Sequence, residues 1–291
     1  MDKKMSPGEF IAYILTPALP LIVFWFIPLF VCLYISFTDW DYISPDYNIV
    51  ALENYSNILT HQAFYSALKN TLFFGLGTVI PTLAIGFLLA VLLYRNVKGK
   101  PLFQAFLFSP WVTPMVAMSI VWSWMYRPEG LINVLLGKFG IDPIMWLSSS
   151  IWALPAVMLV TIWKNAGWAM IFYADALSKI PEALYEVGQL EGANQWQKIT
   201  RILLPMVSGT TFFLAIVSLI DAIQAYDQIS VLTQGGPAGA SRTLLYLYYQ
   251  YAFEQFNVGT ATALAVIIVL LTAVLAVAMK VVNNRISHME G

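Results

Sequence analysis

The sequence predicts an all-α membrane protein that crosses the bilayer about six times. Of its 291 residues, 59% are hydrophobic and 11% are charged, whereas a soluble domain carries about 25% charged residues. Uncharged runs recur along the chain, and each is near or above the roughly 18 residues that cross the hydrocarbon as a helix. We expect a single membrane domain over residues 1–291, with spans at about 10–38, 70–94, 102–126, 151–175, 203–225 and 256–280.

The first span lies near the N-terminus, where a cleaved signal peptide is the alternative. The apolar stretch from Phe10 to Phe37 is too long for the hydrophobic region of such a peptide, and it lacks an obvious small-residue cleavage site. We therefore expect it to remain as a membrane helix. Cys32, the single cysteine, lies within it, so an intrachain disulfide is excluded.

Two polar segments separate the next spans. Residues 39–69 are acidic at their start and contain a short helix near Leu52 to Leu59. Residues 127–150 contain a second short helix near Leu131 to Phe139, bounded by glycine and proline. Neither segment is diagnostic of a function.

The basic residues set the predicted orientation. With the N-terminus inside, ten of the fifteen lysines and arginines fall in inner segments, and cytoplasmic segments are the ones enriched in these residues. Both termini and the segment between the fourth and fifth spans are therefore expected in the cytoplasm. The ten residues are Lys3, Lys4, Arg95, Lys98, Lys100, Lys179, Lys198, Arg201, Lys280 and Arg285.

Several chemistries lack the residues that they need. The chain has no G-x-x-x-x-G-K-[ST] phosphate loop, and its histidines, His61 and His288, begin no zinc-binding H-E-x-x-H pattern. No histidine falls in a span, and Asp221 is the only acid well inside one, so an intramembrane enzyme is disfavoured. We expect no catalytic residue, metal or cofactor in this chain.

The polar segment at 176–205 carries the most specific pattern. It reads EVGQLEGANQWQKITRILLP from Glu186 onward. A short polar helix that is followed by Gly192, and by Pro205 at the next span, forms a compact knob suited to docking in a groove of a partner. Glu182 and Glu186 lie in the first turns of this helix, where negative charge is favourable.

This segment resembles the cytoplasmic EAA loop of ABC importer permeases, whose pattern is Glu-Ala-Ala, three residues, Gly, nine residues and Ile-x-Leu-Pro. The chain departs from it only where Val187 and Gly188 replace the two alanines. The resemblance implies that the loop couples the permease to an ATPase, with Glu186 contacting a basic residue there. Taken alone, the acids would only cap and solubilise a loop. The implied coupling residues are Glu182, Glu186, Gly192, Ile202, Leu204 and Pro205.

Further motifs, in the expected order, narrow the resemblance to the maltose-type, carbohydrate-importing branch. They are Trp163-Lys164, Ile180-Pro181, Tyr185-Glu186, Leu232-Thr233 and Gly235-Gly236-Pro237. The resemblance implies a prokaryotic cell-membrane permease, surrounded by lipid, that imports a carbohydrate by alternating access. It also implies a second homologous permease, two ATPase subunits that bind ATP and Mg, and an extracytoplasmic solute-binding protein, with no role for nucleic acid.

Polar stripes on two predicted spans form a candidate substrate site. On the fourth span, Thr161, Lys164, Asn165 and Trp168 recur at i, i+3, i+4 and i+7, and on the fifth Ser218, Asp221 and Gln224 recur at steps of three. The helical rise places Lys164 roughly 22 Å from Lys179 and Asp221 roughly 24 Å from Pro205, so the two charges lie at similar depth.

Two interpretations of these residues compete. In one, Asn165, Ser218, Gln224 and Asp221 bind sugar hydroxyls while Trp168, and Trp111 on the third span, stack on sugar faces, as the resemblance suggests. In the other, Lys164 and Asp221 form an ion pair that only locks two helices together, a usual compensation for charge in the membrane. If Asp221 leaves it unneutralised, Lys164 would favour an anionic sugar.

The main alternative function is a secondary transporter or channel for a small polar solute. That class predicts paired half-repeats or broken helices that carry coupling-ion ligands, and no convincing internal repeat is visible. Copurification with an ATP-hydrolysing partner separates the two classes. A sugar, a polyol and a phosphorylated glycerol all remain open as the substrate.

Overall fold

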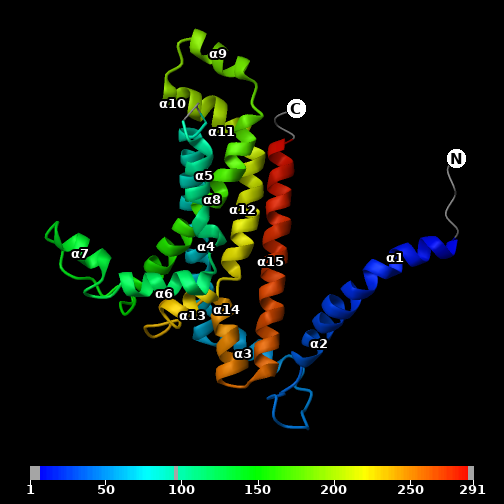
Figure 1. Ribbon diagram of the computed structural model, residues 1–291. Coiled ribbons are helices and arrows are strands. Elements are labelled where there is room, and N and C mark those ends of the chain that lie inside the picture. The colour runs from blue at the N-terminus through cyan, green and yellow to red at the C-terminus, as the bar shows by residue number, and fades with distance from the viewer. Residues whose placement is uncertain (1–6, 95–97, 288–291) are drawn as a thin grey trace. The chain divides into compact units, whose positions relative to one another are not determined.

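The computed structural model describes the backbone of residues 7–94 and 98–287, and their side chains except at residues 7–12, 185 and 282–287. Lys3, Lys4 and Arg95, which contribute to the predicted orientation, lie outside these residues. The elements are helical (Figure 1): α1 (Pro7–Leu21), η1 (Ile22–Phe26), α2 (Ile27–Ile35), α3 (Glu53–Thr60), α4 (Gln62–Leu92), α5 (Lys100–Val112), α6 (Met115–Met125), α7 (Leu131–Gly137), α8 (Ala153–Ser178), α9 (Glu182–Leu190), α10 (Gln195–Lys198), η2 (Ile199–Leu203), α11 (Leu204–Met206), α12 (Ser208–Ile223), α13 (Asp227–Leu232), α14 (Leu244–Tyr249), η3 (Gln250–Glu254) and α15 (Val258–Ser287). The two short helices predicted between spans are present as α3 and α7.

Four segments are long and apolar enough to cross a membrane: Tyr13–Ile35, Gln62–Leu92, Ala153–Ser178 and Val258–Val281. Two further candidate spans are bent pairs of helices. α5 and α6 meet at 95°, and Gln195–Met206 meets α12 at 67°. The described residues therefore hold four to six candidate spans, which confirms an all-α polytopic fold.

The span expected at about 102–126 consists of two helices in the structure rather than one. α5 ends at Val112, Thr113 is extended at φ −73° and ψ 133°, and Pro114 follows at φ −55° and ψ 136°. Proline lacks the N–H that a helix needs and disfavours the helical conformation of the residue before it. The Thr113-Pro114 pair therefore breaks this span into two helices.

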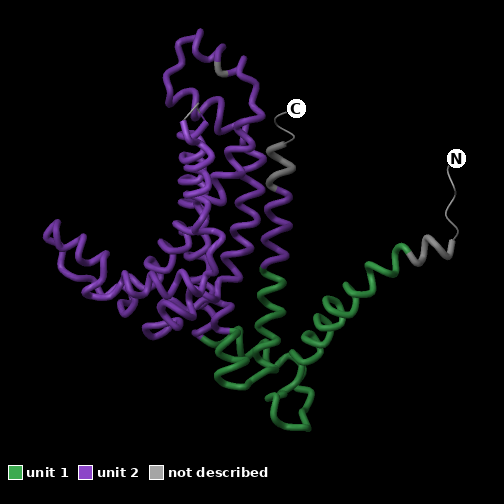
Figure 2. The backbone as a smooth tube through the Cα atoms, viewed as in Figure 1, with its two compact units in different colours: residues 1–61, 248–271 green, residues 62–247, 272–291 purple. Residues whose placement is uncertain are grey.

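The chain forms two compact units (Figure 2), residues 1–61 with 248–271 and residues 62–247 with 272–291. Within the first unit, the segment after α2 is fastened to the start of α15. The Trp40 carbonyl accepts a 3.1 Å hydrogen bond from the Val258 N–H. The buried Asn54 amide donates to the Thr38 carbonyl at 2.8 Å and accepts from the Thr260 hydroxyl at 3.2 Å.

The same segment contains two hydrogen-bonded carboxylates. Asp39 accepts from the Asn48 N–H at 2.6 Å, and Asp41 accepts from the Ser44 N–H at 2.7 Å. These bonds favour the charged forms and lower the pKa of both carboxyl groups below the ordinary value of 3.8. The segment is therefore an acidic turn with a defined backbone.

The second unit is built on close contacts between α4, α5, α8 and α12, which run side by side in Figure 1. Gly86 of α4 lies so close to Ala169 of α8 that an added Cβ would approach the alanine Cβ to 2.6 Å. Gly167 of α8 lies against the main chain of Leu107 in α5. Small residues allow such backbone approach between membrane helices. This core positions both features described next.

Candidate functional site

The predicted coupling segment forms a helical loop beyond the ends of α8 and α12 (Figure 1). α9 (Glu182–Leu190) is its first helix, with Glu182 in the first turn. Glu182 and Glu186 are both exposed. The predicted short polar helix is thus present, and its acids face outward rather than into the bundle.

Gly192 ends α9 in a Schellman arrangement. Its φ of 80° lies in the left-handed region, which glycine adopts without strain. The N–H of Gly192 donates to the Gln189 carbonyl at 3.1 Å, and the N–H of Ala193 donates to the Gly188 carbonyl at 2.9 Å. The sharp turn that the sequence predicts at Gly192 is therefore confirmed.

Gly188 packs against Ile202. A Cβ added to Gly188 would lie 2.7 Å from the Ile202 Cδ1 atom, so glycine lets α9 rest directly on the π-helical turn η2. One predicted coupling residue, Ile202, therefore supports the helix that carries Glu182 and Glu186. The close approach of Ile202 explains why this chain has glycine at position 188, where the EAA pattern has alanine.

A capping box at the start of α10 escaped the sequence analysis. The Asn194 side chain accepts from the Gln197 N–H, and the Gln197 side chain accepts from the Asn194 N–H, both at 2.8 Å. The signal was available in the sequence, since Asn followed three residues later by Gln marks a helix N-terminus. This pair of side chains fixes the start of α10, the second helix of the loop.

Apolar side chains are exposed on the loop together with its acids. Leu190 is 87% exposed and Trp196 is 68% exposed, while Leu184 and Val187 of α9 are also largely open. The predicted residues Leu204 and Pro205 are exposed at the entry to α12. Apolar surface of this kind beside charge is typical of an interface with another protein.

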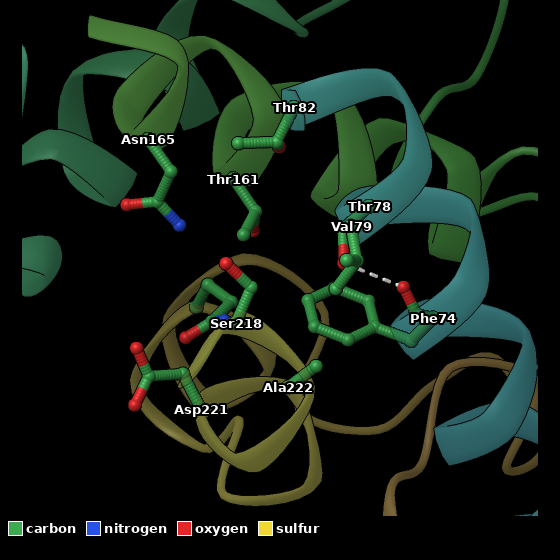
Figure 3. A pocket seen from close by; sticks show the side chains of 10 residues that line it. Phe74, Thr78, Val79, Thr82, Thr161, Asn165, Ser218, Asp221 and Ala222 are labelled. Atoms are coloured by element: carbon green, nitrogen blue, oxygen red, sulfur yellow. Dashed lines mark hydrogen bonds between the residues drawn. The ribbon is translucent and has the colours of Figure 1, made fainter. Parts of the chain in front are cut away.

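A small polar cavity lies between α4, α8, α12 and α13. Its volume is about 70 Å³, and Figure 3 shows side chains from α4, α8 and α12 converging on it. The lining residues are Phe74, Thr78, Val79, Thr82, Thr161, Asn165, Ser218, Asp221, Ala222 and Gln228. A pocket for an organic ligand is typically 300–1,000 Å³, so this cavity is one wall of a sugar-sized site at most.

Only half of the predicted substrate residues line this cavity. Thr161, Asn165, Ser218 and Asp221 do so, whereas Trp111, Lys164, Trp168 and Gln224 do not. Trp168 packs against Phe172, with ring centroids 5.1 Å apart, and Trp111 packs against Phe108 at 5.3 Å. The sequence analysis missed Thr78, Thr82 and Gln228, although the i, i+4 spacing of the two threonines was a usable signal.

Of the two interpretations of Lys164 and Asp221, the ion pair is not present among the described residues. The Lys164 ammonium instead donates to the carbonyl oxygens of Pro110, Trp111 and Thr113, at 3.1, 2.8 and 2.6 Å. The Pro110 carbonyl also accepts from the Thr113 N–H at 3.3 Å. All three carbonyls lie at the C-terminus of α5, where the last carbonyls of a helix need partners and a cation is favourable. The helix break thus provides three acceptors for a half-buried cation.

A comparison with known families decides what kind of chain this is. The profile of the family described as "Binding-protein-dependent transport system inner membrane component" matches residues 82–288. The chain belongs to this family. It is thus an inner-membrane component of a transport system that depends on a binding protein, and the matched region contains the coupling loop and most of the polar cavity.

Individual relatives agree over nearly the whole length. The chain is 32% identical over 276 residues to the probable ABC transporter permease protein PH1215 of Pyrococcus horikoshii, covering 93% of this chain and 94% of the relative. It is 29% identical to the diacetylchitobiose uptake system permease protein NgcF of Streptomyces coelicolor, covering 97% and 84%. The crystal structure of a bacterial alginate ABC transporter shares the fold, with a TM-score of 0.82 at 24% identity over 95% of this chain and 94% of that one.

Proposed function

We propose that this chain is the permease subunit of an ATP-driven importer for a carbohydrate. The observation that carries the proposal is the folded loop at 176–205, in which the EAA-like residues form a helix, a Gly192 turn and a second helix with exposed apolar side chains. Relatives support the carbohydrate class, since NgcF is named for diacetylchitobiose uptake and others for trehalose/maltose and for multiple sugars.

The loop is suited to transmit force between proteins. α9 presents Glu182 and Glu186 together with apolar side chains, and its C-terminal part is held by the Gly192 turn and by the contact between Gly188 and Ile202. A preorganised helix of this kind docks at low entropic cost. We assign its groove to a separate ATPase subunit that binds ATP and Mg, with Glu186 facing a basic residue there.

The polar cavity fits one wall of the translocation path. Its hydroxyl and amide groups, from Thr161, Asn165 and Ser218, are donors and acceptors that suit sugar hydroxyls. Its volume of about 70 Å³ requires a second wall. We assign that wall to a second, homologous permease. An extracytoplasmic binding protein delivers the sugar to the pair. Both termini of this chain lie in the cytoplasm of a prokaryote.

Isolation of the assembled complex tests the proposal. A tag on this chain should recover a second permease and two ATPase subunits, and ATP hydrolysis should rise when sugar-loaded binding protein is added to the complex in liposomes. Sugar uptake should require ATP inside the compartment that holds the ATPases. Uptake driven by an ion gradient without any ATPase partner would favour the secondary-transporter alternative.

A further inference from the structure

Within the part of unit 2 that the structure describes, two charges lie deep in candidate spans, and the structure treats them differently. Lys164 has all three donors of its ammonium group occupied by carbonyls at the break between α5 and α6. Its charge is therefore committed to holding a helix end and does not line the polar cavity.

Asp221 is the opposite case. Its carboxylate lines the cavity, its side chain is exposed in this chain, and it makes no hydrogen bond or ion pair with any residue that the structure describes. A carboxylate in a membrane span must face water or a partner, because burial in hydrocarbon is costly. Its exposure at a polar cavity meets that requirement.

The other side chains around the cavity do not offset this charge. The polar ones are hydroxyls and amides, from Thr78, Thr82, Thr161, Asn165, Ser218 and Gln228. The nearest charged residue along the chain is Asp227, in the first turn of α13, and it is acidic as well. This wall of the site therefore carries net negative charge.

We propose that Asp221 makes the carbohydrate site electronegative, so that the importer accepts uncharged or amino sugars and discriminates against uronates and sugar phosphates. This inference rests on the proposed function, because it concerns the wall assigned there to the translocation path. It reverses the preference for an anionic sugar that a free Lys164 would give. Like charges a few ångströms apart near a protein surface repel strongly enough to discriminate by about tenfold or more.

A cysteine at Ser218 reads the local charge directly. Ser218 and Asp221 are i, i+3 neighbours on α12, so their Cβ atoms are about 5–6 Å apart. In a Cys32→Ser background, the assembled complex carrying Ser218→Cys is treated with a trimethylammonium-ethyl and a sulfonato-ethyl methanethiosulfonate reagent. The rate of modification by the cationic reagent is divided by the rate for the anionic reagent. This ratio, divided by the same ratio for a free thiol in solution, reports the electrostatic potential at position 218. A shift in the thiol's own pKa changes both rates equally and cancels.

We expect a cation-to-anion ratio about tenfold above that of the free thiol, and a fall of about tenfold when Asp221→Asn is added. The isosteric amide removes the charge and little else. Glu191→Gln, which removes the same charge from the distant coupling loop, is the matched control and should leave the ratio unchanged. A ratio that does not respond to Asp221→Asn would overturn the inference while leaving the proposed function intact.

Sugar protection extends the test to substrate class. Chitobiose, a disaccharide that carries two free amino groups, should slow labelling of the Ser218→Cys complex at a lower concentration than digalacturonate does. Asp221→Asn should abolish that difference. Equal protection by the two sugars, including none by either, would overturn the selectivity. If neither reagent reaches position 218 at all, the cavity is not part of a water-filled path, and the wall assigned under the proposed function is wrong.

Discussion

The Lys164 ammonium donates a 2.6 Å hydrogen bond to the Thr113 carbonyl, across the break that divides the third span. Two more carbonyls, of Pro110 and Trp111, complete its coordination. In lipid, irregular backbone is tolerated only where its polar groups are satisfied by the protein or by water. The lysine and the helix break therefore stabilise each other.

Replacing Lys164 should destabilise the bend without involving Asp221. We expect Lys164→Met to lower the stability of the purified complex by about 1–2 kcal/mol, because it removes the charged donor from three carbonyls at the end of α5. Lys164→Arg, which keeps several donors, should lose less. Thermal unfolding in detergent measures both.

The double variant Lys164→Met with Asp221→Asn separates this account from an ion pair. Because the two residues do not pair, the loss of stability in the double variant should equal the sum of the losses in the two single variants, within about 0.5 kcal/mol. Recovery of stability in the double variant would mean that the two charges do pair in the assembled protein.

The contact between Gly188 and Ile202 predicts a size limit at position 188. Gly188→Ala should retain uptake within about twofold, because the atom that the new methyl group meets is the flexible end of the Ile202 side chain, which can move aside. Gly188→Val should reduce uptake about fivefold or more by lifting α9 from its support. Uptake into liposomes that contain the complex is the measurement.

Truncating the opposing side chain provides the control for that prediction. Ile202→Ala should restore part of the uptake of Gly188→Val, since it removes the atom that the new side chain meets. If Gly188→Val is equally impaired with and without Ile202→Ala, the contact does not set the position of α9.

The left-handed backbone at Gly192 predicts a preference for residues that tolerate positive φ. Gly192→Val should cost about 1–2 kcal/mol locally and uncouple uptake from ATP hydrolysis, because a β-branched residue resists this conformation. Gly192→Asn, which adopts positive φ more readily, should retain most of the uptake. Equal uptake by both variants would show that the turn does not depend on its backbone conformation.

The proposed orientation predicts opposite labelling at two positions. In a Cys32→Ser background, Tyr47→Cys should react with an impermeant thiol reagent on intact cells, and Gln195→Cys should not, because basic residues concentrate on the side of the coupling loop. Permeabilised cells, in which both positions react, supply the control. Labelling of position 195 from outside would invert the topology.

The sequence predicts the number of spans and the shape of the coupling loop well, because both depend on local signals. Apolar length locates the spans, and Gly192 after a short polar helix locates the turn. The signal for the break at Thr113-Pro114 is also local. Proline is tolerated in membrane helices, however, so its presence alone does not predict that this helix breaks. The partner of Lys164 was not predictable in this way, since spacing gives the depth of a charge but not the rotation of the neighbouring helix.

The central claim is that the loop at 176–205 couples sugar uptake to ATP hydrolysis, and Glu186→Lys tests it most directly. The complex is reconstituted in liposomes with sugar-loaded binding protein, and uptake and ATP hydrolysis are measured together. Glu191→Lys, the same charge change at an exposed residue just past the end of α9, is the control. We predict that Glu186→Lys lowers uptake about tenfold or more and removes the stimulation of hydrolysis by the binding protein, while Glu191→Lys retains both. Normal uptake and normal stimulation in the Glu186→Lys complex would contradict the account.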